Sequence, residues 1–388
     1  MNSFIFSVPT QIFFGDGQVR AFSEAVKTWG ERALIVYGGG SVKKNGIYEE
    51  IASALKGAGV EVWEFGGIEP NPRIDSVRAG IDVVKKVGAD VIVPIGGGSV
   101  IDAAKLIAAG TLTPGDPWAI VKKEVRVRDA LPICAVLTLA ATGSEMDTSS
   151  VITNLETREK LGWKSSKVLP KASLMNPAYT ATVNAYHTAA GTADIMSHTM
   201  ENYFSVDDSA YMQDSMAEGI LRTCVLSGRA AVKDGADLEA RANLMWASSW
   251  AINGLLSTGK SQAWSVHPME HELSAFYDIT HGVGLAILTP RWLSYVLSAK
   301  TAPKIARFGR RVFDISEKDD VDAAANAIEA LYDFFASLSI PMNLKDVGIG
   351  EENLSAMAKA CAEHADGVIR GFVDLKEADI LAIYKASL

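Results

Sequence analysis

The chain has 388 residues, enough for two domains with a sizeable buried core. Hydrophobic residues make up 48% and charged residues 21%, which is typical of a soluble globular protein, and no apolar stretch is long enough to span a bilayer. The formal net charge of −9 argues against a nucleic acid or an anionic membrane as partner, because both attract clustered Lys and Arg.

In the first half, short β-branched runs alternate with helical stretches. The strand-like runs cover residues 33–40, 60–68, 89–99 and 131–139. This order predicts βαβ units and a mostly parallel sheet with helices on both faces, an α/β Rossmann-like domain. The sequence VITNLETREKLGWK predicts a β-hairpin around Glu156–Thr157, added to that sheet.

After Asn176-Pro177 the strand-like runs end, and the rest of the chain reads as successive helices such as 237–257 and 321–338. We therefore expect two domains. Residues 1–184 form the α/β domain, and residues 185–388 form an all-α C-terminal domain.

Two glycine clusters follow strands of the α/β half. Gly96-Gly97-Gly98-Ser99 stands between an apolar strand and a helix, where backbone N–H groups and the helix N-terminus attract a phosphate. Glycine turns also occur for purely geometric reasons, and this cluster is no GxGxxG fingerprint. This cluster therefore indicates either a dinucleotide-binding site or a purely structural turn.

Gly38-Gly39-Gly40-Ser41 repeats the pattern after the first strand, with Lys43 close behind and no acid in the turn. An acid there would bind the adenosine ribose and repel a 2′-phosphate, whereas glycines, a serine and a lysine accept one. The turn favours NADP(H), with NAD(H) possible. The alternative is a solvated lysine at the start of a helix.

The helical half contains a candidate metal site. Asp194 and His198 stand four residues apart in a helical stretch, which places them on one face. His267 and His281 flank a second such stretch, with His271 between them. One carboxylate with imidazoles suits Zn(II) or Fe(II) and is too nitrogen-rich for Ca²⁺ or Mg²⁺. Any one helix histidine alone is more often a core or surface residue than a ligand.

The N-terminus and the cysteines indicate the cellular compartment. MNSFIFSVPTQIFFGDG lacks the basic start and long apolar run of a signal peptide. The three cysteines, Cys134, Cys224 and Cys361, are far apart and odd in number, so we expect reduced core residues in a cytoplasmic protein.

With these motifs in hand, the chain resembles the iron-containing (group III) alcohol dehydrogenases. Within that family it is most similar to the NADPH-dependent butanol dehydrogenase and aldehyde reductase branch. The resemblance covers essentially the whole chain and rests on YGGGSVKKNGIY, GGGSVIDAAK, TLAATGSEMD, TADIMSHTMENYF and VHPMEHELSAFYDITHGVGLAILTP. It implies the dehydroquinate synthase-like superfold.

The resemblance also implies roles for individual residues. The metal ligands are Asp194, His198, His267 and His281. The further positions matching cofactor contacts are Asp102, Thr138, Thr142, Lys160, Asn71 and, beside the nicotinamide ribose, Tyr179. Asn176 and Asp147 depart from the family's usual Asp and Asn, which leaves detailed cofactor contacts open.

The implied reaction is reversible reduction of a small aldehyde, such as butanal, to a primary alcohol. A divalent metal polarises the carbonyl and the nicotinamide delivers hydride. His271 matches an active-site histidine that is not a ligand, and we expect it to relay the proton, with structural support or cofactor contact as its alternative role.

The N-terminus predicts the oligomeric state. SFIFSVPTQIFFG holds two β-rich runs, 3–7 and 11–14, around Pro9. Left uncovered, such a hydrophobic edge promotes aggregation. Relatives pair this segment with its copy in a second subunit, so the resemblance implies a homodimer.

Three alternatives stay open. A glycerol-dehydrogenase-like enzyme would oxidise polyols with NAD. A dehydroquinate-synthase-like lyase would carry a three-ligand zinc site and a basic phosphate-binding set. A non-catalytic metal- or nucleotide-binding protein would need a closed cleft or a missing relay residue, and the sequence shows neither.

Overall fold

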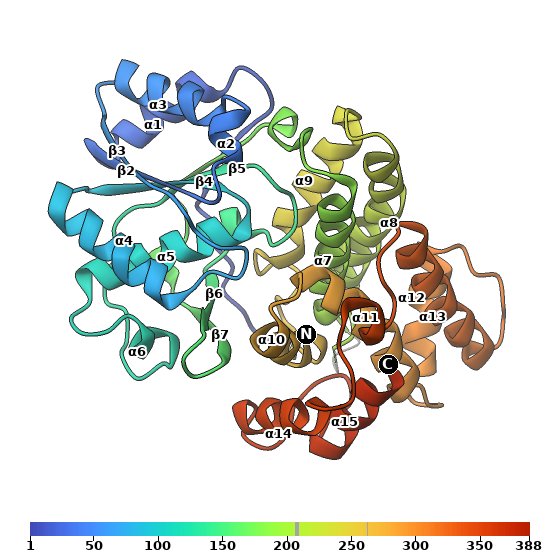
Figure 1. Cartoon of the computed structure of the whole chain (residues 1–388). Coiled ribbons are helices and arrows are strands. Elements are labelled where there is room, and N and C mark those ends of the chain that lie inside the picture. Colours follow the sequence, from blue (N-terminus) through green and yellow to red (C-terminus); the bar gives the residue numbers. More distant parts are fainter. Residues whose placement is uncertain (206–208, 262) are drawn as a thin grey trace. The chain divides into compact units, whose positions relative to one another are not determined.

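The computed structural model describes residues 1–205, 209–261 and 263–388. It divides into two compact units, Ser7–Val183 and a helical unit of Asn184–Leu388 that also includes Met1–Phe6 (Figure 1). The inclusion of the first six residues in the helical unit was not expected from the sequence.

The unit Ser7–Val183 is built on a six-stranded parallel sheet, which confirms the predicted α/β fold class. Its strand order is β1-β8-β5-β4-β2-β3. The strands are β1 (Gln11–Phe14), β2 (Arg32–Tyr37), β3 (Glu61–Phe65), β4 (Val91–Gly96), β5 (Cys134–Leu137) and β8 (Ala172–Met175).

Both faces of this sheet are covered by helices. Because successive residues of a strand point to opposite faces, Leu34 and Val36 of β2 join one apolar core with α4 and α5. Ala33 and Ile35 join the other, with α1 and α3. The helices of this unit are α1 (Val19–Lys27), α2 (Ser41–Lys44), α3 (Ile47–Gly57), α4 (Ile74–Val87), α5 (Gly98–Leu112) and α6 (Trp118–Val121).

The predicted hairpin exists, but its place in the fold was predicted wrongly. β6 (Ser149–Asn154) and β7 (Glu159–Lys164) form their own antiparallel two-stranded sheet. The position beside β5 belongs to β8, a strand that the sequence analysis missed. Its four buried residues are too short an apolar run to distinguish strand from helix by pattern.

The N-terminal segment also differs from expectation. Residues 11–14 form β1, which pairs in parallel with β8 of the same chain, whereas residues 3–7 are not a strand. The Met1 amino group donates to Ser209 Oγ at 2.7 Å, and the Asn2 N–H donates to the Gly259 carbonyl at 2.8 Å. These bonds hold the first residues on the helical unit.

The second unit is all-helical in its described part, as predicted. Its α-helices are α7 (Ala185–Tyr203), α8 (Tyr211–Lys233), α9 (Leu238–Ile252), α10 (Val266–Tyr277), α11 (His281–Val296), α12 (Ala302–Val312), α13 (Asp320–Ser337), α14 (Leu354–His364) and α15 (Glu377–Ala386). Within the ranges that the structure describes, every helix is too short or too polar to cross a bilayer. All three cysteines are free and buried, which confirms the expected thiols.

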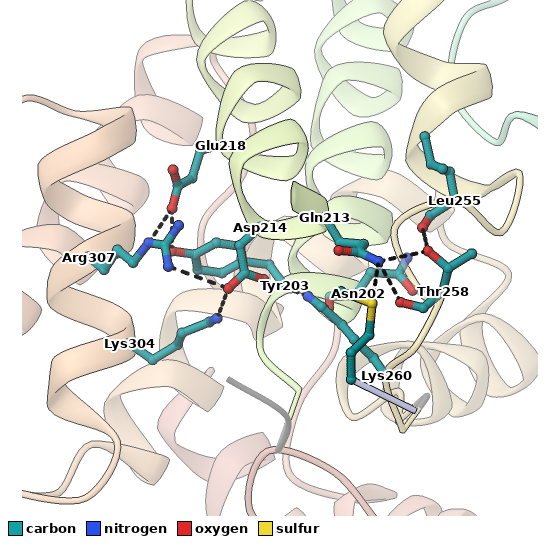
Figure 2. A network of polar contacts seen from close by, with 11 residues as sticks. Asn202, Tyr203, Gln213, Asp214, Glu218, Leu255, Thr258, Lys260, Lys304 and Arg307 are labelled. Atoms are coloured by element: carbon teal, nitrogen blue, oxygen red, sulfur yellow. Dashed lines mark hydrogen bonds and ion pairs between the residues drawn. The ribbon is translucent and has the colours of Figure 1, made fainter. Parts of the chain in front are cut away.

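A buried polar network joins α7, α8 and α12 (Figure 2). Asp214 of α8 accepts from Lys260 at 2.6 Å and also pairs with Lys304 of α12. Glu218, one turn further on, accepts from Arg307 at 2.6 Å and from the Tyr203 hydroxyl at 3.0 Å. Removing Asp214 would take the carboxylate partner from the buried Lys260 ammonium, which is costly. The network therefore fixes the end of α7, the helix that carries Asp194 and His198.

Candidate metal and cofactor sites

Helix α7 presents the first two predicted metal ligands on one buried face. Asp194 and His198 are 3% and 4% exposed, and His198 Nε2 lies 3.5 Å from Asp194 Oδ1. Four residues is just over one helical turn, so both side chains point the same way.

The other two predicted ligands come from the next helices. His267 stands in the first turn of α10, and His281 is the first residue of α11. Donor atoms of Asp194, His267 and His281 all lie within 4.8 Å of one another. His198 adjoins this group, with its ring stacked on that of His267 at 4.8 Å between centroids. Four residues from three helices thus lie close together.

A buried carboxylate orients His267. Glu201, 2% exposed, lies 3.1 Å from His267 Nδ1 through Oε1 and accepts the backbone N–H groups of Val266 and His267 at 2.7 and 2.9 Å. Because the carboxylate is an acceptor, Nδ1 carries the proton and Nε2 keeps its lone pair. His267 Nε2 is buried and makes no hydrogen bond within the part of the chain that the structure describes. That is the state of a metal-ligating histidine.

His281 is held in the same way. Its Nδ1 contacts the carboxylate of Glu270, a fully buried residue of α10 that also accepts the Ser274 hydroxyl at 2.5 Å. His281 Nε2 lies 3.8 Å from Asp194 Oδ1. The Nε2 atoms of His198 and His281 thus both lie near the Asp194 carboxylate. Such a donor set fits a tetrahedral Zn(II) or an Fe(II) ion.

Electrostatics keep the remaining imidazole neutral. Burial, followed by the neighbouring His267 and His281, holds the pKa of His198 well below its ordinary value. A neutral imidazole is the form that binds a metal. The Trp264 indole, 4.5 Å from the His267 ring between centroids, covers the cluster with an apolar surface.

His271, the predicted proton relay, lies beside the metal cluster. It stands one turn after His267 on α10, is half-buried, and its ring centroid is 5.7 Å from that of His281. His187 is exposed, and His364 pairs with the buried Glu272 at 2.8 Å.

The candidate cofactor site lies in the unit Ser7–Val183, at the carboxyl ends of β2 and β4. These neighbours pair with Tyr37 opposite Ile95, so both glycine turns begin at the same sheet edge. The chain runs outward from β2 to β3 and then returns to β4 on the other side of β2. Such a switch in strand order is where nucleotides bind in open α/β sheets.

The second turn is packed so closely that only glycine fits. A Cβ on Gly98 would lie 2.2 Å from Thr142 Oγ1, and one on Gly96 would lie 2.5 Å from Val100. The Thr138 N–H donates to the Gly96 carbonyl at 3.0 Å. The structure thus gathers Thr138 and Thr142 around the N-terminus of α5, as a phosphate site requires.

The remaining cofactor candidates approach the same end of α5. Ser99 Oγ contacts the Pro70 carbonyl, which brings the loop containing Asn71 to the helix. The Thr153 N–H donates to the Pro72 carbonyl at 2.8 Å, and Thr153 pairs with Lys160 in the hairpin. The separate β6–β7 sheet therefore delivers Lys160 to this region.

Two cofactor candidates are occupied by contacts inside the protein. Asp102 accepts the Ser144 hydroxyl at 2.6 Å and the Val151 N–H at 2.8 Å, and burial raises its pKa to about 6. The Tyr179 hydroxyl donates to Glu50 at 2.8 Å, while its ring joins an apolar core. These contacts indicate supporting positions, and direct contact of either with a cofactor stays a prediction.

Asp147, one of the two departures from the family pattern, has a clear structural role. It pairs at 2.5 Å with Lys105, whose ammonium also donates to Ser144 Oγ and the Ser149 carbonyl at 2.8 Å. The other departure, Asn176, caps the following 3-10 helix by accepting the Ala178 N–H at 3.1 Å. The substituted side chains therefore stabilise local structure.

Sequence analysis missed the carboxylates that orient the histidines. One signal was present. Asp194, His198 and Glu201 have the spacing of a single helix face, so a third polar residue follows the two ligands. Glu270 likewise follows His267 by three residues, as Glu201 follows His198. A carboxylate one turn from a candidate ligand on an otherwise buried helix face is the pattern to seek.

Comparison with known proteins identifies the family. Residues 9–177 match the model of the family "Iron-containing alcohol dehydrogenase", and residues 188–388 match the family's C-terminal model. The chain is 51% identical over 388 residues to NADH-dependent butanol dehydrogenase A of Clostridium acetobutylicum, covering 100% of both proteins. It is 38% identical over 367 residues to the NADPH-dependent aldehyde reductase YqhD of Escherichia coli, covering 94% of each.

A solved structure extends the comparison to the fold. The crystal structure of NADH-dependent butanol dehydrogenase A from Thermotoga maritima superposes with a TM-score of 0.95 at 35% identity, covering 100% of this chain and 99% of that one. The chain therefore belongs to the iron-containing alcohol dehydrogenase family, whose members interconvert alcohols and aldehydes.

Proposed function

We propose that this protein reduces small aldehydes such as butanal to primary alcohols, reversibly, with a reduced nicotinamide cofactor and one divalent metal. The observation that carries the proposal is the state of His267. Its Nδ1 is bound to Glu201, and its buried Nε2 is left with a lone pair beside Asp194 and His281. The butanol dehydrogenase and aldehyde reductase relatives named above support the substrate class.

In this proposal Asp194, His198, His267 and His281 hold Fe(II) or Zn(II). A metal bound there supplies a Lewis acid for the carbonyl oxygen, and the nicotinamide supplies hydride. Glu201 and Glu270 hold two of the imidazoles in the tautomer that binds metal. Which metal is bound depends on availability, because this donor set accepts either ion.

His271 is proposed to pass a proton to the nascent alkoxide. It lies one turn from His267 and is half-buried, so its ring can reach both the cluster and water. An imidazole titrates near working pH and can donate at one nitrogen while it accepts at the other.

We propose that the glycine-rich edge of the sheet accepts both NADPH and NADH. The Gly38–Ser41 turn contains no acid, and Gly39 faces open space, so a 2′-phosphate has room. Relatives of both kinds exist, since the 51% identical protein is named NADH-dependent and the 38% identical one NADPH-dependent. The preference for NADPH stays a prediction.

The alternatives are separated by substrate. Relatives at 34% identity include the 1,3-propanediol dehydrogenase of Citrobacter freundii, so a diol or polyol is the nearest rival substrate class. The family matches favour an oxidoreductase over a lyase or a non-catalytic binding protein.

The test is a rate panel with purified protein, using C2–C8 aldehydes, 3-hydroxypropanal and dihydroxyacetone, each with NADPH and NADH. We expect the highest kcat/KM with unbranched aldehydes near four carbons. Faster turnover of dihydroxyacetone than of butanal would assign the enzyme to polyols. Absence of cofactor oxidation with every substrate would refute the proposed reaction.

We further propose a homodimer formed through the N-terminal segment, and a cytoplasmic location. Phe4, Ile5 and Phe6 are 52%, 99% and 40% exposed. Three consecutive exposed apolar residues are a liability unless a partner covers them.

A further inference from the structure

A charged and aromatic cluster lies next to the first glycine turn. Lys43 of α2 approaches Glu64 of β3 at 2.6 Å between Nζ and Oε2. The same ammonium lies 4.9 Å from the ring centroid of Tyr37 and 4.6 Å from that of Tyr48. Lys43 is therefore held by one carboxylate and two aromatic faces.

The position of this cluster follows from the sheet. Strand β3 is the neighbour of β2, with Glu64 opposite Ile35, and Tyr37 is the last residue of β2 before the Gly38–Ser41 turn. Tyr37 is also packed closely, because a Cβ on Gly66 would lie 2.5 Å from its ring. The cluster is thus built into the strand ends that form the turn.

The ion pair is partly exposed, and each group favours the charged form of the other. The hydrogen bond from Lys43 lowers the pKa of Glu64, and the Glu64 carboxylate raises the pKa of Lys43. Both groups are charged at neutral pH, so the pair contributes no net charge. The lysine that the sequence offered as a phosphate partner is already neutralised by an acid from another strand.

We propose that Glu64 is a specificity-determining residue that limits recognition of the cofactor's 2′-phosphate by engaging Lys43. The proposal rests on the cofactor site described above. A 2′-phosphate approaching the turn meets a lysine whose charge is compensated, together with a carboxylate that repels it. NADH has one uncharged hydroxyl group at the 2′ position and is far less sensitive to the pair. The acid that the turn lacks is supplied by β3.

The test is direct binding of NADPH and NADH by calorimetry to the intact protein, to Glu64→Gln and to the double variant Glu64→Gln with Lys43→Met. Glutamine keeps the size and polarity of the side chain and removes its charge. We expect the ratio of the NADH to the NADPH dissociation constant to rise about tenfold in Glu64→Gln, the value of one charge-assisted hydrogen bond. The gain should shrink between 50 mM and 500 mM salt, because it is electrostatic.

The matched control is Glu61→Gln, an exposed glutamate at the start of the same strand, which should leave the ratio within twofold. The double variant should not show this rise in the ratio, because the group that Glu64→Gln releases for the phosphate is Lys43. A ratio unchanged in Glu64→Gln, or a gain that persists without Lys43, would overturn the proposal. Binding needs no turnover, so a failure of the proposed reaction would appear separately, as cofactor binding without aldehyde reduction.

Discussion

The Glu201 carboxylate lies 3.1 Å from Nδ1 of His267 and accepts the backbone amides at the start of α10. One buried side chain of α7 thereby fixes both the position of a neighbouring helix and the tautomer of a histidine on it. A carboxylate at a helix N-terminus is also favoured by the helix dipole. The geometry of the candidate metal site therefore depends on the same contacts that pack α7 against α10.

Glu201→Gln should weaken metal binding about 10- to 100-fold, the range for loss of an outer-shell carboxylate. The amide would place an N–H₂ group beside the backbone N–H donors of Val266 and His267. It would also accept less strongly from the protonated Nδ1 of His267. Affinity is measured by competition with a chelator of known strength, on protein whose circular dichroism matches the parent. Glu329→Gln, an exposed glutamate of α13, is the control. Equal metal affinity in both variants would contradict the assigned role.

Asp102→Asn should change how stability depends on pH. The folded carboxyl has a pKa of about 6, above the ordinary 3.8, because of burial. Between these values the folded state binds more protons, so the free energy of unfolding falls as pH rises from 4 to 6. Asp102→Asn lacks this pH-dependent loss. Its free energy of unfolding should therefore rise relative to that of the parent by at most about 3 kcal/mol across that window. Urea unfolding at pH 4, 5, 6 and 7 measures the free energy of unfolding of both proteins. The same pH dependence in both would refute the buried Asp102 carboxyl as its cause.

Gly39→Asp should shift cofactor use toward NADH. A Cβ at Gly39 meets no atom within 4 Å, so the substitution adds charge without a clash. The new carboxylate should repel a 2′-phosphate and bind a ribose hydroxyl. The ratio of kcat/KM for NADPH to that for NADH should fall about tenfold or more. Gly57→Asp, also without close neighbours, is the control. Equal ratios in both variants would exclude the turn as the 2′ site.

Much of this architecture was predictable, and the exceptions share a physical cause. Asp194 and His198 were found from helical spacing, which is local, and their convergence with His267 and His281 was expected from the chemistry of the set. Spacing placed Glu201 on the face of Asp194 and His198, but the partners of Glu201 and Glu64 lie on other elements, and spacing alone does not identify them. The pairing of β8 with β5, and the separation of the β6–β7 hairpin from the main sheet, depend on which strands pair with one another. Such pairing is not encoded in the local pattern of either segment.

Ile5→Asp should convert a dimer into monomers. Ile5 is 99% exposed, so the charge costs the folded subunit little, whereas an apolar interface would have to bury it. Light scattering at micromolar concentration should give a dimer for the parent and a monomer for the variant. Val321→Asp, an exposed valine of α13, should remain dimeric. A monomeric parent, or a dimeric Ile5→Asp protein, would contradict the proposed interface.

In the proposed reaction, a divalent metal held by Asp194, His198, His267 and His281 is required for aldehyde reduction. The most direct measurement is the butanal reduction rate against bound metal content, in chelator-treated protein and after adding back Fe(II) or Zn(II) anaerobically. His267→Ala is measured beside it. We expect the rate to vanish with the metal and to return in proportion to the metal restored. In His267→Ala the rate should not return, while cofactor binding persists. Full activity in demonstrably metal-free protein would contradict it.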